Sequence, residues 1–232
     1  MVRLPDEPAG HVADVLTFDW SLVRYAAPLL AQGLAVTLKI SALAIVFGTL
    51  LGFVFGLLSV GPVAPLRWFV RAYVDFVRGT PLLIQVFLVY FALPVVGINL
   101  SEFWAGVVAL SLNAAGFIAE IVRAGISSIE LGQTEAAKSI GMTPRQVLTF
   151  ILLPQIYRPV LPPLTNELIA LVKGSSLLSV ISVYELTRAG QAIISERFVP
   201  FEIYTMIALY YYVVISFLSW LSRSLEQRLH AW

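Results

Sequence analysis

Apolar residues run through most of the chain in five long stretches, and the charged residues gather in the short segments between them. A helix needs about 20 consecutive apolar residues to cross the hydrocarbon core of a bilayer. The pattern therefore predicts an all-α membrane protein with five transmembrane helices. Their expected bounds are roughly Leu34–Leu58, Pro81–Val96, Glu102–Ala124, Val160–Val183 and Phe201–Leu221.

The second run is short, and an amphipathic stretch, Val63–Arg78, precedes it with three arginines on one helical face. We expect a break at Gly79–Pro81 between the two. Thr80 is a residue that can cap a helix, and Pro81 suits the first helical position, so a new helix is predicted to begin there.

Basic residues are distributed unequally between the two sides of the predicted membrane. Cytoplasmic loops carry an excess of Lys and Arg, and one side holds nine such residues against four on the other. This asymmetry predicts an extracytoplasmic N-terminus and a cytoplasmic C-terminus in a bacterial inner-membrane protein. The nine are Arg67, Arg71, Arg78, Arg123, Lys138, Arg145, Arg158, Arg223 and Arg228; the four are Arg3, Arg24, Arg188 and Arg197.

This orientation gives the expected organisation of the chain. Residues 1–32 form an extracytoplasmic segment, residues 33–222 form the transmembrane domain, and residues 223–232 form a cytoplasmic tail. The opening residues are polar and lack the short apolar region of a cleavable signal peptide, so the first membrane helix is expected to act as its own insertion signal.

The composition excludes several classes of function. Hydrophobic residues make up 59% and charged residues 12% of the chain, against about 25% charged in soluble domains. The chain has no cysteine, and its two histidines lie near opposite ends. We therefore expect no disulfide, no metal site and no cofactor. A net charge of +1 gives no support for nucleic-acid binding.

Gly48, Gly52 and Gly56 recur at every fourth position of the first predicted span. Small residues at this spacing allow two helices to approach closely. The run predicts tight packing within the chain, and the alternative is a self-association face.

The polar stretch from Glu135 to Pro154 combines a helix start, a turn and a second helix start. Alanines after Glu135 favour a helix with a flat face, and Gly141 permits the positive φ that ends one. Thr143 with Gln146 fits a capping box around Pro144. These features predict a short helix held against the membrane surface, either as a docking element or as an ordinary connector.

This stretch, "EAAKSIGMTPRQVLTFILLP", resembles the EAA motif of binding-protein-dependent ABC importer permeases. Two further stretches, "FVRGTPLLIQVFLVYFALP" and "NAAGFIAEIVRAGISSIELGQTEAAKSIG", are similar to the polar amino-acid subfamily, and the resemblance runs from about residue 33 to the C-terminus. The motif is EAA, three residues, Gly, nine residues, then I-x-L-P. The matching positions are Glu135, Ala136, Ala137, Gly141, Ile151, Leu153 and Pro154.

The resemblance implies a type I ABC importer permease fold and a function in amino-acid import. It implies that the loop 127–154 is a cytoplasmic coupling loop whose Glu135, Ala136, Ala137 and Gly141 contact an ATPase. The implied partners are a cytoplasmic ATPase dimer, a second permease subunit, an extracytoplasmic solute-binding protein, the amino-acid substrate and membrane lipid. The chain has no phosphate-binding loop of its own, so it is expected not to be an enzyme.

Polar residues inside the predicted spans are candidates for the substrate path, because an unpaired polar group in lipid is costly. Each also has a structural alternative. Asn113 could make an interhelical hydrogen bond, Glu120 an ion pair with Arg123, and Lys173 a pair with a carboxylate. The candidate path residues are Asn113, Glu167, Lys173, Ser175 and Ser176.

Family members often carry Asp or Asn at the position of Gly174. This chain has glycine there, and the absence of a carboxylate weakens a preference for arginine-like substrates. Other small polar solutes, such as an opine or a compatible solute, remain open. An ion-coupled secondary transporter would be expected to show paired intramembrane carboxylates and repeat symmetry, and an intramembrane enzyme a nucleophile with its base. The sequence shows neither pattern.

Overall fold

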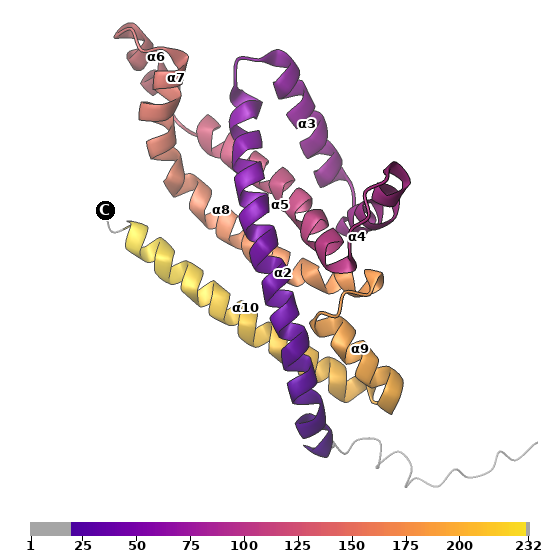
Figure 1. The fold of residues 1–232 in the computed structure, drawn as a ribbon. Helices are drawn as coiled ribbons and strands as arrows, with labels where there is room; N and C mark the ends of the chain where they lie inside the picture. The colour runs from indigo at the N-terminus through magenta and orange to yellow at the C-terminus, as the bar shows by residue number, and fades with distance from the viewer. Residues whose placement is uncertain (1–19, 231–232) are drawn as a thin grey trace, which may run out of the picture.

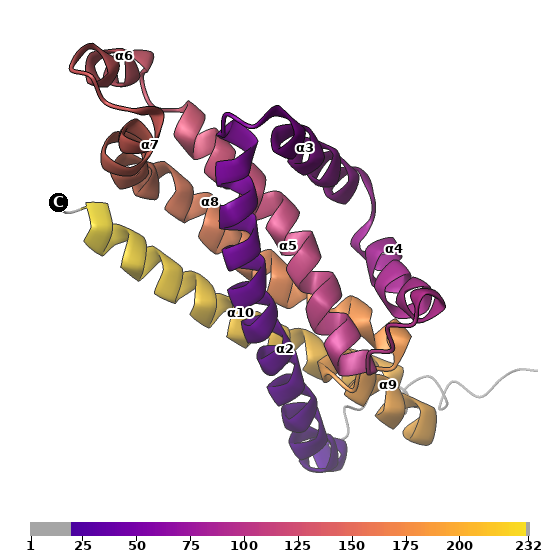
Figure 2. The same cartoon turned by 45° about the horizontal axis from the view of Figure 1, so that its top comes forward.

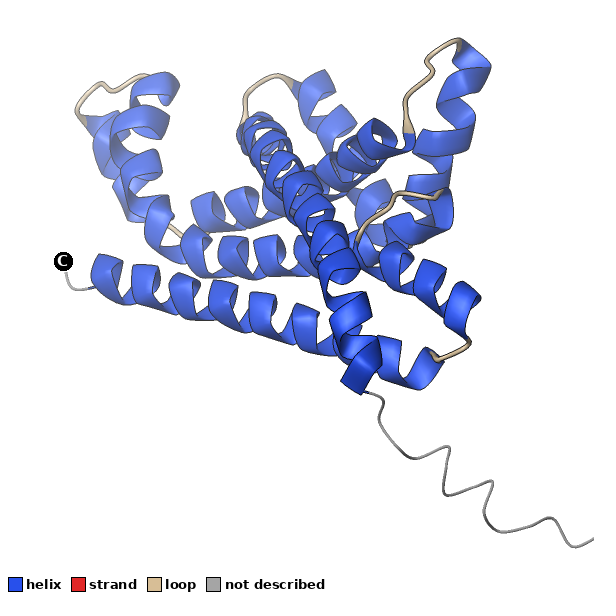
Figure 3. Cartoon of the chain, turned by 60° about the horizontal axis from the view of Figure 1, so that its bottom comes forward, coloured by secondary structure: helices blue, strands red, loops and turns tan. Residues whose placement is uncertain are grey.

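The computed structural model describes residues 20–230, and every regular element in that range is helical (Figure 3). The chain passes back and forth along a bundle built around α2 and α5 (Figure 1). The elements are α2 (Trp20–Val60), α3 (Ala64–Gly79), α4 (Leu82–Phe87), η1 (Leu88–Ala92), η2 (Leu93–Val96), α5 (Glu102–Ser127), α6 (Leu131–Ser139), α7 (Pro144–Gln146), η3 (Val147–Leu152), α8 (Leu153–Gly174), η4 (Ser175–Ile181), α9 (Leu186–Arg197) and α10 (Pro200–His230).

Four helical segments of the described chain are long and apolar enough to cross a membrane. They are Ser21–Val60, Glu102–Ser127, Pro144–Ile181 and Pro200–Ser224. The bent pair Ala64–Gly79 and Leu82–Val96 becomes a fifth candidate when it is taken as one span. The predicted all-α fold with five spans is confirmed in this form, with the amphipathic arginine-bearing helix α3 added to the second span.

The glycine run of α2 packs against α5 inside the same chain, as the sequence predicted. A Cβ at Gly48 would lie 2.9 Å from that of Ala114, and one at Gly52 would lie 2.7 Å from that of Ile118. At Gly56 the corresponding distance to Val122 is 2.5 Å. No side chain larger than hydrogen fits at these positions without movement, so the glycines set the separation of the two helices.

The first helix is longer than the sequence predicted. It begins at Trp20 rather than near Leu34 and contains 41 residues, which at about 1.5 Å per residue extend for about 60 Å. The added turns pack into the bundle, because Leu22, Ala26 and Leu30 are buried with residues of α9 and α10. Residues 20–32 therefore belong to the helical core, and residues 1–19 lie outside the described part.

The break between α3 and α4 turns the chain by 113° (Figure 2). The expected cap at this break was wrong, because the Thr80 hydroxyl donates to the Phe76 carbonyl at 2.8 Å and so closes the end of α3. The buried Gln85 amide donates to the carbonyls of Val77 (2.8 Å) and Thr80 (3.1 Å) and thus fixes the bend.

Helix α8 continues through three prolines, Pro159, Pro162 and Pro163. It packs on α5 from the side away from α3, where a Cβ at Gly125 would lie 2.4 Å from Val160 Cγ2. The Thr165 hydroxyl joins α8 to α10 by donating to Glu226 at 2.9 Å.

We predict that Gly52→Ala destabilises the protein by about 1–3 kcal/mol, because the new methyl group overpacks the α2–α5 contact. Thermal unfolding of the purified protein in detergent measures the effect. Gly79→Ala is the matched control, since a Cβ at Gly79 meets nothing within 4 Å. Equal melting temperatures for the two variants would contradict the assignment of the glycine run to intramolecular packing.

Candidate functional site

The loop between α5 and α8 has the turn and the capping box that the sequence predicted. Gly141 has a φ of 83°, and the Met142 amide donates back to the Ala137 carbonyl at 3.1 Å. The Thr143 hydroxyl accepts from the Gln146 amide at 3.4 Å, while the Thr143 amide donates to Gln146 Oε1 at 2.8 Å. These bonds hold α6 at one end of the molecule, the end where α2 meets α3 (Figure 1).

The four residues proposed for coupling do not share one environment. Glu135, Ala136 and Gly141 are exposed, as are the apolar side chains of Leu131 and Ile140 at the two ends of α6. Ala137, in contrast, is only 4% exposed, on the side of α6 that packs toward η3. Its methyl group therefore supports the loop from inside, and the surface open to a partner is formed by its neighbours.

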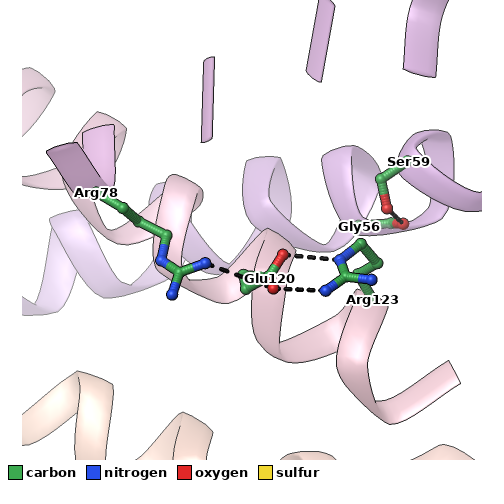
Figure 4. A network of polar contacts seen from close by, with 5 residues as sticks. All are labelled: Gly56, Ser59, Arg78, Glu120 and Arg123. Carbon is green, nitrogen blue, oxygen red and sulfur yellow. Dashed lines mark hydrogen bonds and ion pairs between the residues drawn. The ribbon is translucent and has the colours of Figure 1, made fainter. Parts of the chain in front are cut away.

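Glu120 is the centre of an ion-pair network between α3 and α5 (Figure 4). Arg123 donates Nε and Nη2 to the two carboxylate oxygens at 2.8 and 2.6 Å, which is a bidentate pair. Arg78 Nη1 lies 3.4 Å from Glu120 Oε1. The predicted local pair with Arg123 is confirmed, and Arg78 is a partner that the sequence analysis did not anticipate.

Asn113 makes the interhelical hydrogen bond that was its structural alternative. Its amide donates to Gln85 Oε1 at 3.0 Å and so joins α5 to the bend between α3 and α4. Asn113 remains half-buried, which leaves part of its side chain on the surface of this subunit. Gln85 was missed in the sequence, although it is the one amide side chain of the run Pro81–Val96.

Lys173, Ser175 and Ser176 lie where α8 passes into η4, and Glu167 lies six residues before Lys173 in α8. Lys173 is exposed and has no ion pair among the described residues, and the Ser176 hydroxyl donates to its carbonyl at 2.9 Å. Ser175 is fully buried and donates to the Val172 carbonyl at 2.8 Å, so it does not reach a surface of this subunit. Glu167 is half-buried on α8.

Gly174 packs this junction against the helices that carry Gln85 and Asn113. A Cβ there would lie 2.9 Å from Leu82 Cδ2 and 4.0 Å from Leu110 Cδ2. Leu82 and Leu110 each stand three residues before Gln85 and Asn113, about one helical turn away. The junction that carries Lys173 and Ser176 thus packs beside α4 and α5, about one turn before Gln85 and Asn113. Leu82 occupies the space that a side chain at position 174 would need.

A second polar centre, also missed in the sequence, lies around Glu185. This carboxylate is fully buried and caps α9 by accepting from the Thr187 amide at 2.9 Å and the Arg188 amide at 2.7 Å. Tyr211 of α10 donates to it at 3.2 Å. Burial raises the pKa of Glu185, while these hydrogen bonds oppose that shift. The cap positions α9, and its hydrogen bonds offset the cost of burying the carboxylate.

Residues 45–231 match the family described as binding-protein-dependent transport system inner membrane component. The chain belongs to this family. It is therefore a multi-pass inner-membrane permease subunit with no catalytic role, and the resemblance of the "EAA" stretch to such permeases is confirmed.

The permease is similar to curated relatives over nearly its whole length. It is 36% identical over 215 residues to the arginine transport system permease protein ArtQ of Bacillus subtilis, covering 92% of this chain and 98% of the relative. It is also 36% identical over 216 residues to the glutamine transport system permease protein GlnP of Escherichia coli, covering 92% and 99%.

A solved structure described as an amino acid ABC transporter with histidines superposes on the permease with a TM-score of 0.85. The two chains are 39% identical, and the match covers 92% of this chain and all of the other. The type I ABC importer permease fold predicted from the sequence is confirmed.

We predict that Gly141→Ala loosens the loop by about 1–2 kcal/mol, because a residue with a Cβ is strained at positive φ. Amide hydrogen exchange over residues 131–146 should become about 5- to 30-fold faster. Gly132→Ala is the control. Neither glycine has an atom within 4 Å of a Cβ, but Gly132 lies in α6 with an ordinary φ, so alanine should preserve or slow exchange there. Faster exchange in both variants would contradict the backbone explanation.

Proposed function

We propose that the permease carries polar amino acids across the inner membrane as a subunit of an ATP-driven importer. The proposal is supported most directly by an exposed helix, α6, held on a rigid elbow in a chain whose relatives are amino-acid permeases. Two permease subunits would enclose the path, two ATPases would bind at the α6 end, and a solute-binding protein would deliver substrate at the opposite end.

Coupling rests on the stiffness of the loop. The capping box and the turn at Gly141 tie α6 to η3 and α8, so α6 cannot move without moving α8. Closure of the ATPases on ATP would displace α6 and shift the permease between inward- and outward-facing states. Glu135 and Ala136 offer a polar anchor and a flat surface for contact, while Ala137 keeps the helix in place.

The substrate path is assigned to the layer that contains Asn113, Lys173 and Ser176, with Glu167 further along α8. The Lys173 ammonium is exposed and unpaired among the described residues, and a cation at this depth needs a counter-charge or water. The carboxylate of an amino acid supplies such a counter-charge.

The orientation is tested by two single cysteines in a chain that has no native cysteine. Ser139 of α6 and Ser195 of α9 are both exposed. With the α6 end in the cytoplasm, Ser195→Cys should react with an impermeant maleimide in intact spheroplasts, and Ser139→Cys only after lysis. Labelling of Ser139→Cys from outside would reverse the proposed topology.

The coupling surface is tested by Ala136→Trp, which places a large side chain on the exposed surface of α6. We expect normal permease levels, at least a tenfold loss of uptake, and loss of the ATPase on co-purification. Leu50→Trp is the control, because Leu50 is 63% exposed on α2 and lies outside the coupling loop. Retention of the ATPase and of full uptake by Ala136→Trp would refute docking at α6.

A further inference from the structure

A cavity of about 290 Å³ lies between α3 and α5, beside the end of α2. Five charged side chains line it, and we call it the arginine–aspartate cavity. Arg71, Asp75 and Arg78 come from α3, where spacings of four and three residues place them on one face. Glu120 and Arg123 come from α5.

The charges in this cavity are only partly matched. Both carboxylate oxygens of Glu120 are already paired, through the bidentate contact with Arg123 and the longer contact with Arg78. Arg71 and Asp75 make no hydrogen bond or ion pair with any described residue, although they stand one turn apart. The cavity therefore presents one free guanidinium, the remaining donors of Arg78, and one free carboxylate.

The position of the cavity relates it to the substrate path. Asn113 and Glu120 are seven residues apart on α5, so they lie on one stripe of that helix. The Asn113 end of the stripe belongs to the layer assigned to substrate. The Glu120 end lines the arginine–aspartate cavity, about two turns further along α5 toward the end of that helix that leads to α6.

We infer that the arginine–aspartate cavity is a second amino-acid site, at the α6 end of the path. The inference rests on the proposed function. Arg71 and Arg78 bind the α-carboxylate, since guanidinium groups pair with carboxylates in a planar fork. Asp75 binds the α-ammonium. A ligand that carries both signs satisfies both unmatched groups, whereas a simple anion leaves Asp75 unpaired.

The same charges select among amino acids. Three guanidinium groups face two carboxylates, so the cavity has an excess of one positive charge. A cationic side chain is repelled there, and a neutral polar side chain is accepted. The preferred substrate class is neutral polar amino acids.

Binding of radiolabelled L-glutamine to the purified complete transporter, without ATP and without binding protein, tests the site. Asp75→Asn and Arg71→Gln should each weaken one of two binding components at least tenfold, and leave the component assigned to the Lys173 layer unchanged. Arg67→Gln is the matched control on the same helix, because Arg67 donates to the Gly61 carbonyl at 3.0 Å and does not line the cavity. It should bind within twofold of the unaltered protein.

A des-amino analogue of glutamine separates recognition from a merely structural effect. The unaltered site should prefer glutamine to the analogue at least tenfold, and Asp75→Asn should lose that preference. L-arginine should compete poorly in all forms. Unchanged glutamine binding in both cavity variants would overturn the inference, as would a site that binds glutamine, its des-amino analogue and inorganic phosphate equally, because that is an anion site.

Uptake in the same preparations keeps the two proposals apart. If the reconstituted transporter imports amino acids while the cavity variants bind glutamine normally, the proposed function stands and the second site is wrong. If the transporter imports no amino acid at all, the proposed function itself fails.

Discussion

The close approach of α2 and α5 is the constraint on which the rest of the structure depends. Three glycines remove the α2 side chains from the contact, so the α2 backbone packs directly against Ala114, Ile118 and Val122 of α5 over about two turns. Because hydrophobic burial gives little driving force between helices in lipid, such contact and its dispersion energy are the main source of association. With α2 fixed behind it, α5 can receive α3 on one side and α8 on the other.

This arrangement leaves one stripe in the second half of α5 only half-buried, at Asn113, Phe117 and Glu120. Asn113 and Glu120 stand on that stripe, and each binds the neighbouring α3–α4 segment, through Gln85 and Arg78 respectively. The polar contacts thus fix the lateral position of α3 and α4 without filling the stripe. Packing holds the outside of the bundle, and hydrogen bonds hold the side that faces the proposed path.

The sequence predicted features that depend on local chemistry better than those that depend on distant neighbours. The capping box at Thr143, the turn at Gly141 and the pair of Glu120 with Arg123 were found in the sequence. Each of these involves partners at most five residues apart. The burial of Ala137 was not, because it depends on how η3 returns beneath α6. The start of α2 at Trp20 was missed because polar residues interrupt the apolar pattern, and only contacts with α9 and α10 stabilise those turns. Gln85 was missed because its partners lie at the bend after α3 and on α5. Glu185 caps α9 through amides only two and three residues away, and its distant partner is Tyr211 of α10.

The prolines of α8 have a consequence for solvation. A proline has no N–H to give, so the carbonyls four residues earlier, those of Gln155, Arg158 and Pro159, receive no backbone partner from Pro159, Pro162 and Pro163. An unmet carbonyl in hydrocarbon costs several kcal/mol, and non-helical hydrogen bonding at membrane depth is tolerated only beside protein or water. This half of α8, which directly follows η3, must therefore turn its open carbonyls toward an aqueous or protein surface rather than toward lipid tails. A helix wetted along one side bends there at low cost, and the bend lies next to the element on which the ATPases are proposed to act.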